Sequence, residues 1–161
     1  MKKTALIIIS IFAISSFAYS QNVIYVKEKC YEGYIFSKEH SIWGFPPEKE
    51  RYTLSPEDIS RVEKILRDSI NTYYVKSNQK AYIKPPINRK TLIKYMRQYV
   101  GYLTDSEEIV IWVNLFMKKN IGNQDPALDI ISVQGGGYKF WSIHINITTK
   151  ELSNMQVNEI S

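Results

Sequence analysis

The chain changes its pattern of hydrophobic and polar positions at Ser55, where apolar residues begin to recur every three or four positions. Such spacing is typical of an amphipathic helix with one buried side. Ser55 is a suitable N-cap, and Pro56 suits the first helical position. Leu54 and Ile59 occupy the two positions of a hydrophobic staple. The pattern predicts a helix of about 18–20 residues. The apolar positions of its buried side are Ile59, Val62, Ile65, Leu66, Ile70 and Tyr73.

The second half of the chain is rich in β-branched and aromatic residues, separated by residues that favour turns. The strands predicted there cover residues 91–103, 109–117, 129–133, 138–147 and 152–157. In the first of these, Leu92, Met96 and Val100 also fit one side of a helix, but the Tyr and Val content favours a strand. Shorter strands are expected at 23–26 and 34–36.

One helix followed by strands with short connections predicts an α+β protein rather than a parallel α/β sheet. We expect one long amphipathic helix packed on a curved antiparallel sheet of four to five strands. This single domain covers residues 53–161, and residues 21–52 are expected to form an irregular N-terminal segment with short strands.

Residues 1–20 have the composition of a secretory signal peptide. Lys2 and Lys3 precede an apolar run that is shorter than the roughly 20 residues of a membrane span. Ala18 and Ser20 are small residues at the two positions that a signal peptidase recognises, which predicts cleavage before Gln21. A short leader that begins with lysines resembles those of Gram-negative bacteria. We therefore expect an exported protein, periplasmic or secreted, with no transmembrane segment in the mature chain.

The order of a long helix and then an antiparallel meander, over residues 54–158, resembles the cystatin-like and NTF2-like rolls. The segment Asn146–Leu152 also looks like the terminal hairpin of small exported modules of this kind. The Gln-x-Val-x-Gly loop of cystatin inhibitors is absent, and Gln134–Gly137 lies in a different hairpin. The resemblance therefore implies a fold, and it carries over no catalytic residue.

The composition excludes several kinds of chemistry. A single Cys rules out an intrachain disulfide and a Cys-based zinc site, and two His residues are too few for a His-built metal centre. The net charge of +5 falls to +3 when Lys2 and Lys3 leave with the signal peptide, which carries no acidic residue. This charge is too small for a dedicated nucleic-acid binder. We expect no metal, no cofactor and no specific nucleic acid, and we expect Cys30 to be a small buried residue.

The strongest strands divide into two faces, because side chains alternate along a strand. The side chains expected to meet the helix are Ile111, Val113, Leu115, Trp141, Ile143, Ile145 and Ile147. The opposite face carries aromatic, amide and histidine groups, which suit an interface. The residues assigned to binding are Tyr95, Arg97, Tyr99, Trp112, Asn114, Gly135, Gly136, Gly137, Tyr138, Phe140 and His144.

Two alternatives remain open for that face. Residues 22–52 contain Phe36, Trp43 and Phe45, and this segment is long enough to fold across the face and bury it. Ser142 and His144 are neighbours on one strand face and invite a catalytic interpretation, but no acidic residue is placed to orient the histidine. A structural histidine is the simpler interpretation.

The segment between Ser69 and Thr104 has no acidic residue, which favours an acidic partner surface, an anionic glycan or lipid headgroups. Its seven basic residues are Lys76, Lys80, Lys84, Arg89, Lys90, Lys94 and Arg97. The alternative is a solvated connection whose charge is balanced in space by acidic residues elsewhere.

The leading hypothesis is an exported, non-catalytic binding module that docks a protein or peptide partner, in an inhibitor or immunity-type role. It would use the aromatic face and the hairpin at Gly135–Gly137. One alternative is an NTF2-like small-ligand pocket protein or enzyme using Arg97, Tyr99, Asn114 and His144. Another is a glycan-binding accessory protein, given the 12 Tyr residues, of which one lies in the signal peptide.

Overall fold

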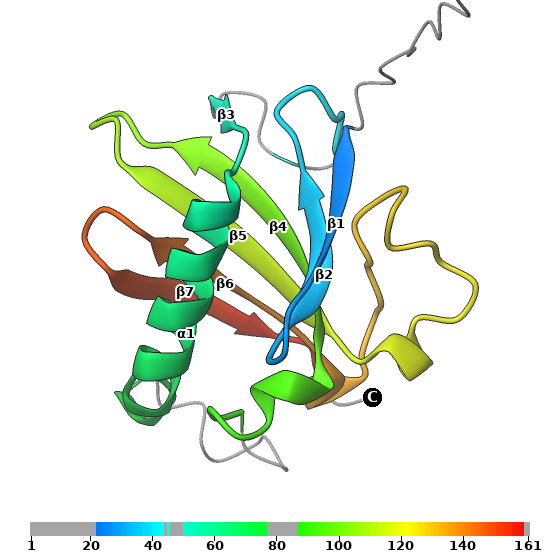
Figure 1. The fold of residues 1–161 in the computed structure, drawn as a ribbon. Helices are drawn as coiled ribbons and strands as arrows, with labels where there is room; N and C mark the ends of the chain where they lie inside the picture. The colour runs from blue at the N-terminus through cyan, green and yellow to red at the C-terminus, as the bar shows by residue number, and fades with distance from the viewer. Residues whose placement is uncertain (1–21, 44, 46–49, 77–86, 160–161) are drawn as a thin grey trace, which may run out of the picture.

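One helix, α1 (Pro56–Lys76), lies against a seven-stranded mixed sheet in the computed structural model, which describes residues 22–43, 45, 50–76 and 87–159 (Figure 1). The strands are β1 (Val23–Lys27), β2 (Glu32–Phe36), β3 (Arg51–Tyr52), β4 (Met96–Leu103), β5 (Ile109–Phe116), β6 (Phe140–Asn146) and β7 (Glu151–Val157). The described residues also form short 3₁₀ turns at η2 (Leu92–Lys94), η3 (Lys118–Asn120) and η4 (Gly137–Lys139). The predicted α+β class is confirmed. The signal peptide predicted over residues 1–20 lies outside the described residues.

The sheet is larger than the expected four to five strands, and it is not purely antiparallel. Its order is β1-β2-β4-β5-β6-β7, with β3 pairing to β4 as well, so the strands before residue 53 belong to the same sheet. β2 and β4 are parallel because the chain crosses over through α1 between them. Their close approach requires Gly33, where a Cβ atom would lie 2.3 Å from the carbonyl oxygen of Arg97.

The start of α1 agrees with the sequence signals. The Ser55 hydroxyl oxygen accepts a hydrogen bond from the Asp58 backbone N–H at 3.1 Å, and the Ser55 N–H donates to Asp58 Oδ2 at 3.0 Å. Leu54 and Ile59 are both buried, as the staple requires. In the described part of the chain, no helix has both the length and the apolar content that crossing a membrane requires.

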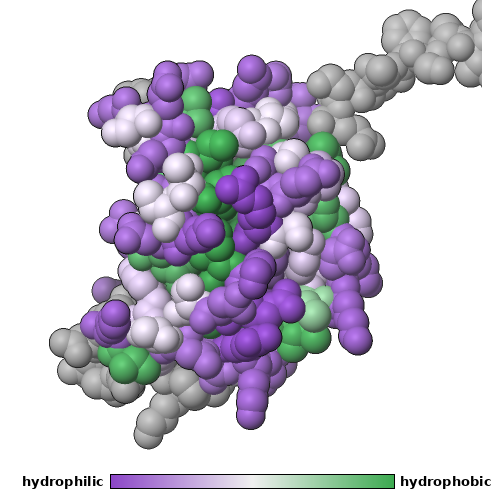
Figure 2. Space-filling view, turned by 60° about the vertical axis from the view of Figure 1, so that its left-hand side comes forward, coloured by the Kyte–Doolittle hydropathy of each residue, from purple (hydrophilic) through white to green (hydrophobic). Residues whose placement is uncertain are grey.

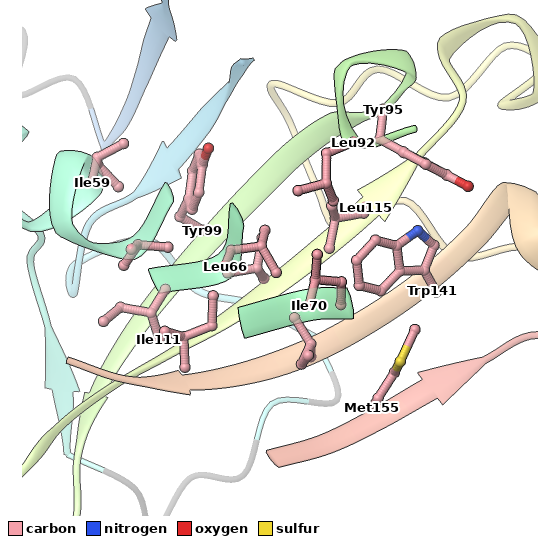
Figure 3. Close-up of a cluster of buried hydrophobic side chains, with 14 of the residues drawn as sticks. Ile59, Leu66, Ile70, Leu92, Tyr95, Tyr99, Ile111, Leu115, Trp141 and Met155 are labelled. Atoms are coloured by element: carbon pink, nitrogen blue, oxygen red, sulfur yellow. The ribbon is translucent and has the colours of Figure 1, made fainter. Parts of the chain in front are cut away.

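The main core lies between α1 and the near face of β4, β5 and β6 (Figure 3). Ile59, Leu66 and Ile70 extend from the helix into this layer, and all three are buried. The Tyr95 and Trp141 rings meet edge to face, with centroids 5.6 Å apart. The predicted helix-facing side chains of β5 and β6 are confirmed. They are Ile111, Val113, Leu115, Trp141, Ile143 and Ile145, together with Ile147 just after β6.

Three strand predictions need correction. The segment 91–103 begins with η2, and the strand starts only at Met96. The strand expected from Tyr138 starts at Phe140, because η4 precedes it. Residues 129–133 form no strand, because their backbone groups bond to side chains of the sheet. The Ile131 N–H donates to Gln98 Oε1 at 2.9 Å, and the Ile131 carbonyl accepts from Asn114 Nδ2 at 2.9 Å.

The outermost strand β7 is irregular. Its pairing with β6 shifts register between Ser142 and His144, and Asn154 has a left-handed backbone with φ 48°. Met155 turns inward beside this irregularity and is buried in the main core.

Candidate binding groove

Three residues assigned to the aromatic face lie on the opposite side of the sheet, next to α1. Tyr99 and Arg97 are the register partners of Val113 and Leu115, so their side chains share the helix-facing side. Tyr95, just before β4, packs in the same core. The expectation that these three residues join Trp112 on one face is therefore wrong.

The buried position of Tyr95 predicts a loss of stability at high pH. Burial raises the pKa of Tyr95 from 10.0 to about 12. The unfolded chain releases this proton near pH 10 while the folded protein retains it, so the contribution present below pH 10 is lost as the pH rises through about 12. Urea denaturation across this range should show a fall in the free energy of unfolding that is shallower in Tyr95→Phe. An equally steep fall in the free energy of unfolding of Tyr95→Phe would show that Tyr95 is not the group responsible.

Most of the other residues predicted to bind a partner are also buried or half-buried. Asn114 and Phe140 face away from α1 as expected but are buried, while Tyr138 packs against the helix-side core. Trp112 and His144, register partners on β5 and β6, are half-buried. The glycine segment Gly135–Gly137 has positive φ throughout, and the Gly137 N–H donates to the Glu159 carbonyl at 3.0 Å. The segment leads into η4, which begins at Gly137, and it bonds to the chain beyond β7 rather than forming a two-strand hairpin.

Two segments cover the face that points away from α1. Part of the 22–52 segment lies across it, since the Phe45 ring is 6.0 Å from that of Tyr102 and the His40 ring is 4.8 Å from that of Phe36. The loop after β5 covers another part and makes a second core, which comprises Met96, Phe116, Ile121, Ile131 and Phe140. A broad exposed aromatic face is therefore absent from the described part of the sheet.

The four residues of the pocket-enzyme alternative do not converge. Arg97 and Tyr99 lie on the helix side of the sheet, whereas Asn114 and His144 lie on the other side. His144 Nδ1 lies 2.7 Å from the Tyr102 hydroxyl oxygen, which supports the structural role expected for this histidine.

Two adjoining hollows lie between α1 and the turn that joins β1 to β2. The first has a volume of about 500 Å³ and the second about 450 Å³, and Cys30 and Arg67 line both. We call the two together the basic groove. The first hollow continues towards the start of α1 and includes Glu28, Lys29 and Ile59, and the second continues towards η2. In Figure 1 the β1–β2 turn comes down beside the lower half of α1 and above η2. Cys30, expected to be buried, is half-exposed in this turn.

A buried ion pair forms part of the wall of the second hollow. Arg97 Nε lies 3.0 Å from Glu63 Oε1, and the Tyr99 hydroxyl donates to the same oxygen at 2.7 Å. The Glu63 and Arg97 side chains are 2% and 1% exposed. A second guanidinium nitrogen of Arg97 donates to the Tyr95 carbonyl. Burial and the neighbouring Glu63 hold the pKa of Tyr99 well above its usual value, so its hydroxyl remains a donor to the carboxylate. The charge of Glu63 is thus already matched inside the protein.

The other charged side chains of the second hollow are basic. Arg67, Arg89 and Lys90 line it, and no further acidic side chain of the described residues does so. Arg89 lies 4.0 Å from Asp68, while Arg67 and Lys90 take part in no ion pair within the described part of the chain. Glu63 is matched by Arg97, and Glu28 in the first hollow offsets one of the remaining basic side chains. The groove as described still has an excess of positive charge, which favours an anionic ligand.

A third hollow, on the other side of α1, differs in its charges. It has a volume of about 500 Å³ and is lined by Arg61 and Lys64 among others. Lys64 Nζ lies 2.7 Å from Asp68, and Arg61 donates to the Ile147 carbonyl at 3.1 Å and lies 3.8 Å from Asp58. Figure 2 shows that the surface on this side is mostly hydrophilic, with a hydrophobic stripe between hydrophilic borders. Arg61 and Lys64 are thus both paired, and among the described residues Lys150 is the one basic side chain of this hollow without an ion pair, whereas the basic groove has Lys29, Arg67 and Lys90.

The sequence contained one signal for the groove. The acid-free segment 69–104 supplies Arg89, Lys90 and Arg97, but Arg67 and Cys30 come from elements that no local pattern joins to it. No group of three or more His, Cys, Asp and Glu residues suited to a metal ion is found among the described residues. Comparison of the chain with protein-family models, curated proteins and solved structures found no match.

Proposed function

We propose that this protein is an exported, non-catalytic binding module that docks a protein or peptide partner by an acidic segment in the basic groove. The observation that carries the proposal is the charge of the second hollow. Among the described residues, Arg97 pairs with the single carboxylate of this hollow, and three further basic side chains line it. Export rests on the signal-peptide pattern of residues 1–20.

The shape of the groove favours an extended segment over a small ion. Two hollows in a row give room for several residues of a peptide, and Arg67 lies where they meet. Apolar side chains also line the groove, including Ile59 in the first hollow and Leu92 and Ile93 in the second. Ile93 is 64% exposed, so an apolar side chain of the partner gains buried contact there. A segment with alternating acidic and apolar residues satisfies both requirements.

The non-catalytic part of the proposal rests on the state of the charged groups. Glu63 is the one carboxylate in the second hollow, and it is held by both Arg97 and Tyr99. A general base must be free to reach a proton of the substrate, and Glu63 has no such freedom.

The test uses the mature chain, residues 21–161, and a fluorescent peptide of alternating Glu and Leu residues. Arg67→Glu combined with Lys90→Glu should weaken binding at least about tenfold, because two attractive contacts become repulsive. Fluorescence anisotropy at several salt concentrations measures the affinity. The matched control combines Lys118→Glu with Lys119→Glu, two exposed residues of η3 outside the groove.

The control separates a groove from general charge attraction, because both double variants change the net charge equally. We expect the control variant to bind nearly as tightly as the unaltered chain, and we expect a peptide with Lys in place of Glu to bind poorly. An equal loss of affinity in both double variants would overturn the assignment to the groove. The proposal also fails if the unaltered chain does not bind the acidic peptide. Affinity that does not change with salt would also contradict the proposal.

A further inference from the structure

A smaller hollow lies on the side of the sheet that faces away from α1, beside the loop over residues 130–133. Its volume is about 230 Å³, and Trp112, Ser142 and Gln156 belong to the strands that line it. Among the residues that the structure describes, no Asp, Glu, Lys or Arg lines this hollow. It is therefore chemically unlike the basic groove, and it favours a ligand that is polar but carries no charge.

The polar side chains of this hollow form a row across three strands. Asn114 is the register partner of Ser142, and Ser142 is the register partner of Gln156. Register partners project from the same face, with neighbouring strands about 4.8 Å apart. The row therefore places hydrogen-bonding side chains at regular intervals along the hollow.

Two of the amides fix the wall of the hollow in place. Asn114 Nδ2 donates to Gln98 Oε1 at 3.0 Å and to the Ile131 carbonyl at 2.9 Å. Asn158 Nδ2 donates to the carbonyls of Val133 and Gly135. Because these bonds hold the loop against the sheet, the hollow is already formed without a ligand. Ser132, Ser142 and Gln156 also line the hollow, and no hydrogen bond within the described residues uses their side chains.

Trp112 completes the hollow with an aromatic surface. It is half-buried on the same face of β5 as Asn114 and lies two positions before it. A neutral sugar has an apolar C–H face, which packs well on an indole, and a polar rim of hydroxyl groups. We propose that this hollow is a subsite for one neutral pyranose unit, with Trp112 against the sugar face and Ser142 and Gln156 bonding its hydroxyls.

The test uses the mature chain and the methyl glycosides of glucose, galactose, mannose and N-acetylglucosamine, with methyl glucuronide as a charged probe. Saturation-transfer NMR and calorimetry measure binding at millimolar sugar concentrations. We expect at least one neutral glycoside to bind and the glucuronide to bind at least about tenfold more weakly, since nothing in the hollow matches its charge.

The variant Gln156→Ala should lower the affinity for that glycoside at least about fivefold, because a hydrogen bond to the ligand is lost. Gln156 is exposed, so this change leaves the fold intact. The matched control is Gln134→Ala, the same change at an exposed residue that does not line the hollow. Trp112→Leu keeps an apolar side chain and should also weaken binding.

Each other outcome counts against the proposal. It is overturned if none of the neutral glycosides binds, if the glucuronide binds as well as glucose, or if Gln156→Ala and Gln134→Ala behave alike. Combining Arg67→Glu with Lys90→Glu should leave sugar binding unchanged, so this site and the basic groove are tested independently.

Discussion

The variant Glu63→Ala should lose about 3–5 kcal/mol of stability, because it leaves the Arg97 guanidinium buried without its countercharge. Arg97 is 1% exposed, so water cannot replace the lost carboxylate without opening the packing beneath α1. The Tyr99 hydroxyl loses its acceptor in the same step. Urea denaturation followed by circular dichroism measures the change in the free energy of unfolding.

The matched control for Glu63→Ala is Asp68→Ala on the same helix. Asp68 pairs with Lys64 at 2.7 Å but is exposed, so its loss should cost less than about 1 kcal/mol. Replacing both partners of the buried pair, Glu63→Leu with Arg97→Met, should recover much of the lost stability because no unpaired charge remains. Equal effects of Glu63→Ala and Asp68→Ala would show that the buried pair does not stabilise the fold.

The second large effect is expected for Leu66→Ala, at about 2–5 kcal/mol. Leu66 is fully buried at the middle of the helix face that meets the sheet (Figure 3). Removing its side chain takes away apolar contact and leaves a cavity that the surrounding strands fill only in part.

Val75→Ala is the control within the same helix, because Val75 is 51% exposed. Its change in the free energy of unfolding should be within about 0.5 kcal/mol of zero. If Leu66→Ala proved as mild as Val75→Ala under urea, the helix would not be packed against the sheet as described.

The helix was predictable because its signals are local. Ser55, Pro56 and the apolar spacing that follows lie within a few turns of one another, and the structure starts α1 at that point. The pairing of β2 with β4 was not predictable in the same way. It joins segments on either side of α1, and no local pattern states which strand lies beside which.

In β4, the alternation of side chains along the strand does not predict which face is buried. Both sets of alternate residues contain polar groups, so polarity does not tell which set is buried. Arg97 is buried because Glu63 comes from the helix to pair with it, and Gln98 is buried because loop carbonyls accept from its amide at 2.8 and 2.9 Å. In each case the partner is more than 25 residues away in the chain.

The same limit applies to the candidate sites. The basic groove combines Cys30 from a turn, Arg67 from α1 and Lys90 from the segment before η2. Of these three residues, only Lys90 belongs to the acid-free segment whose basic residues the sequence analysis singles out. Strand alternation predicts that Trp112, Asn114 and Phe140 share the face away from α1, and all three line the hollow on that side of the sheet. Gln156 was missed because its strand carries too few apolar residues to show which face is which.

The irregular pairing of β7 also affects how readily the protein associates with other copies of itself. A straight outer strand offers a row of free N–H and C=O groups onto which another chain can add. The register shift beside Ser142 and the left-handed backbone at Asn154 bend that row, so a second copy finds no continuous ladder to extend. The distortion that turns Met155 into the core thus also protects this end of the sheet from self-association and aggregation.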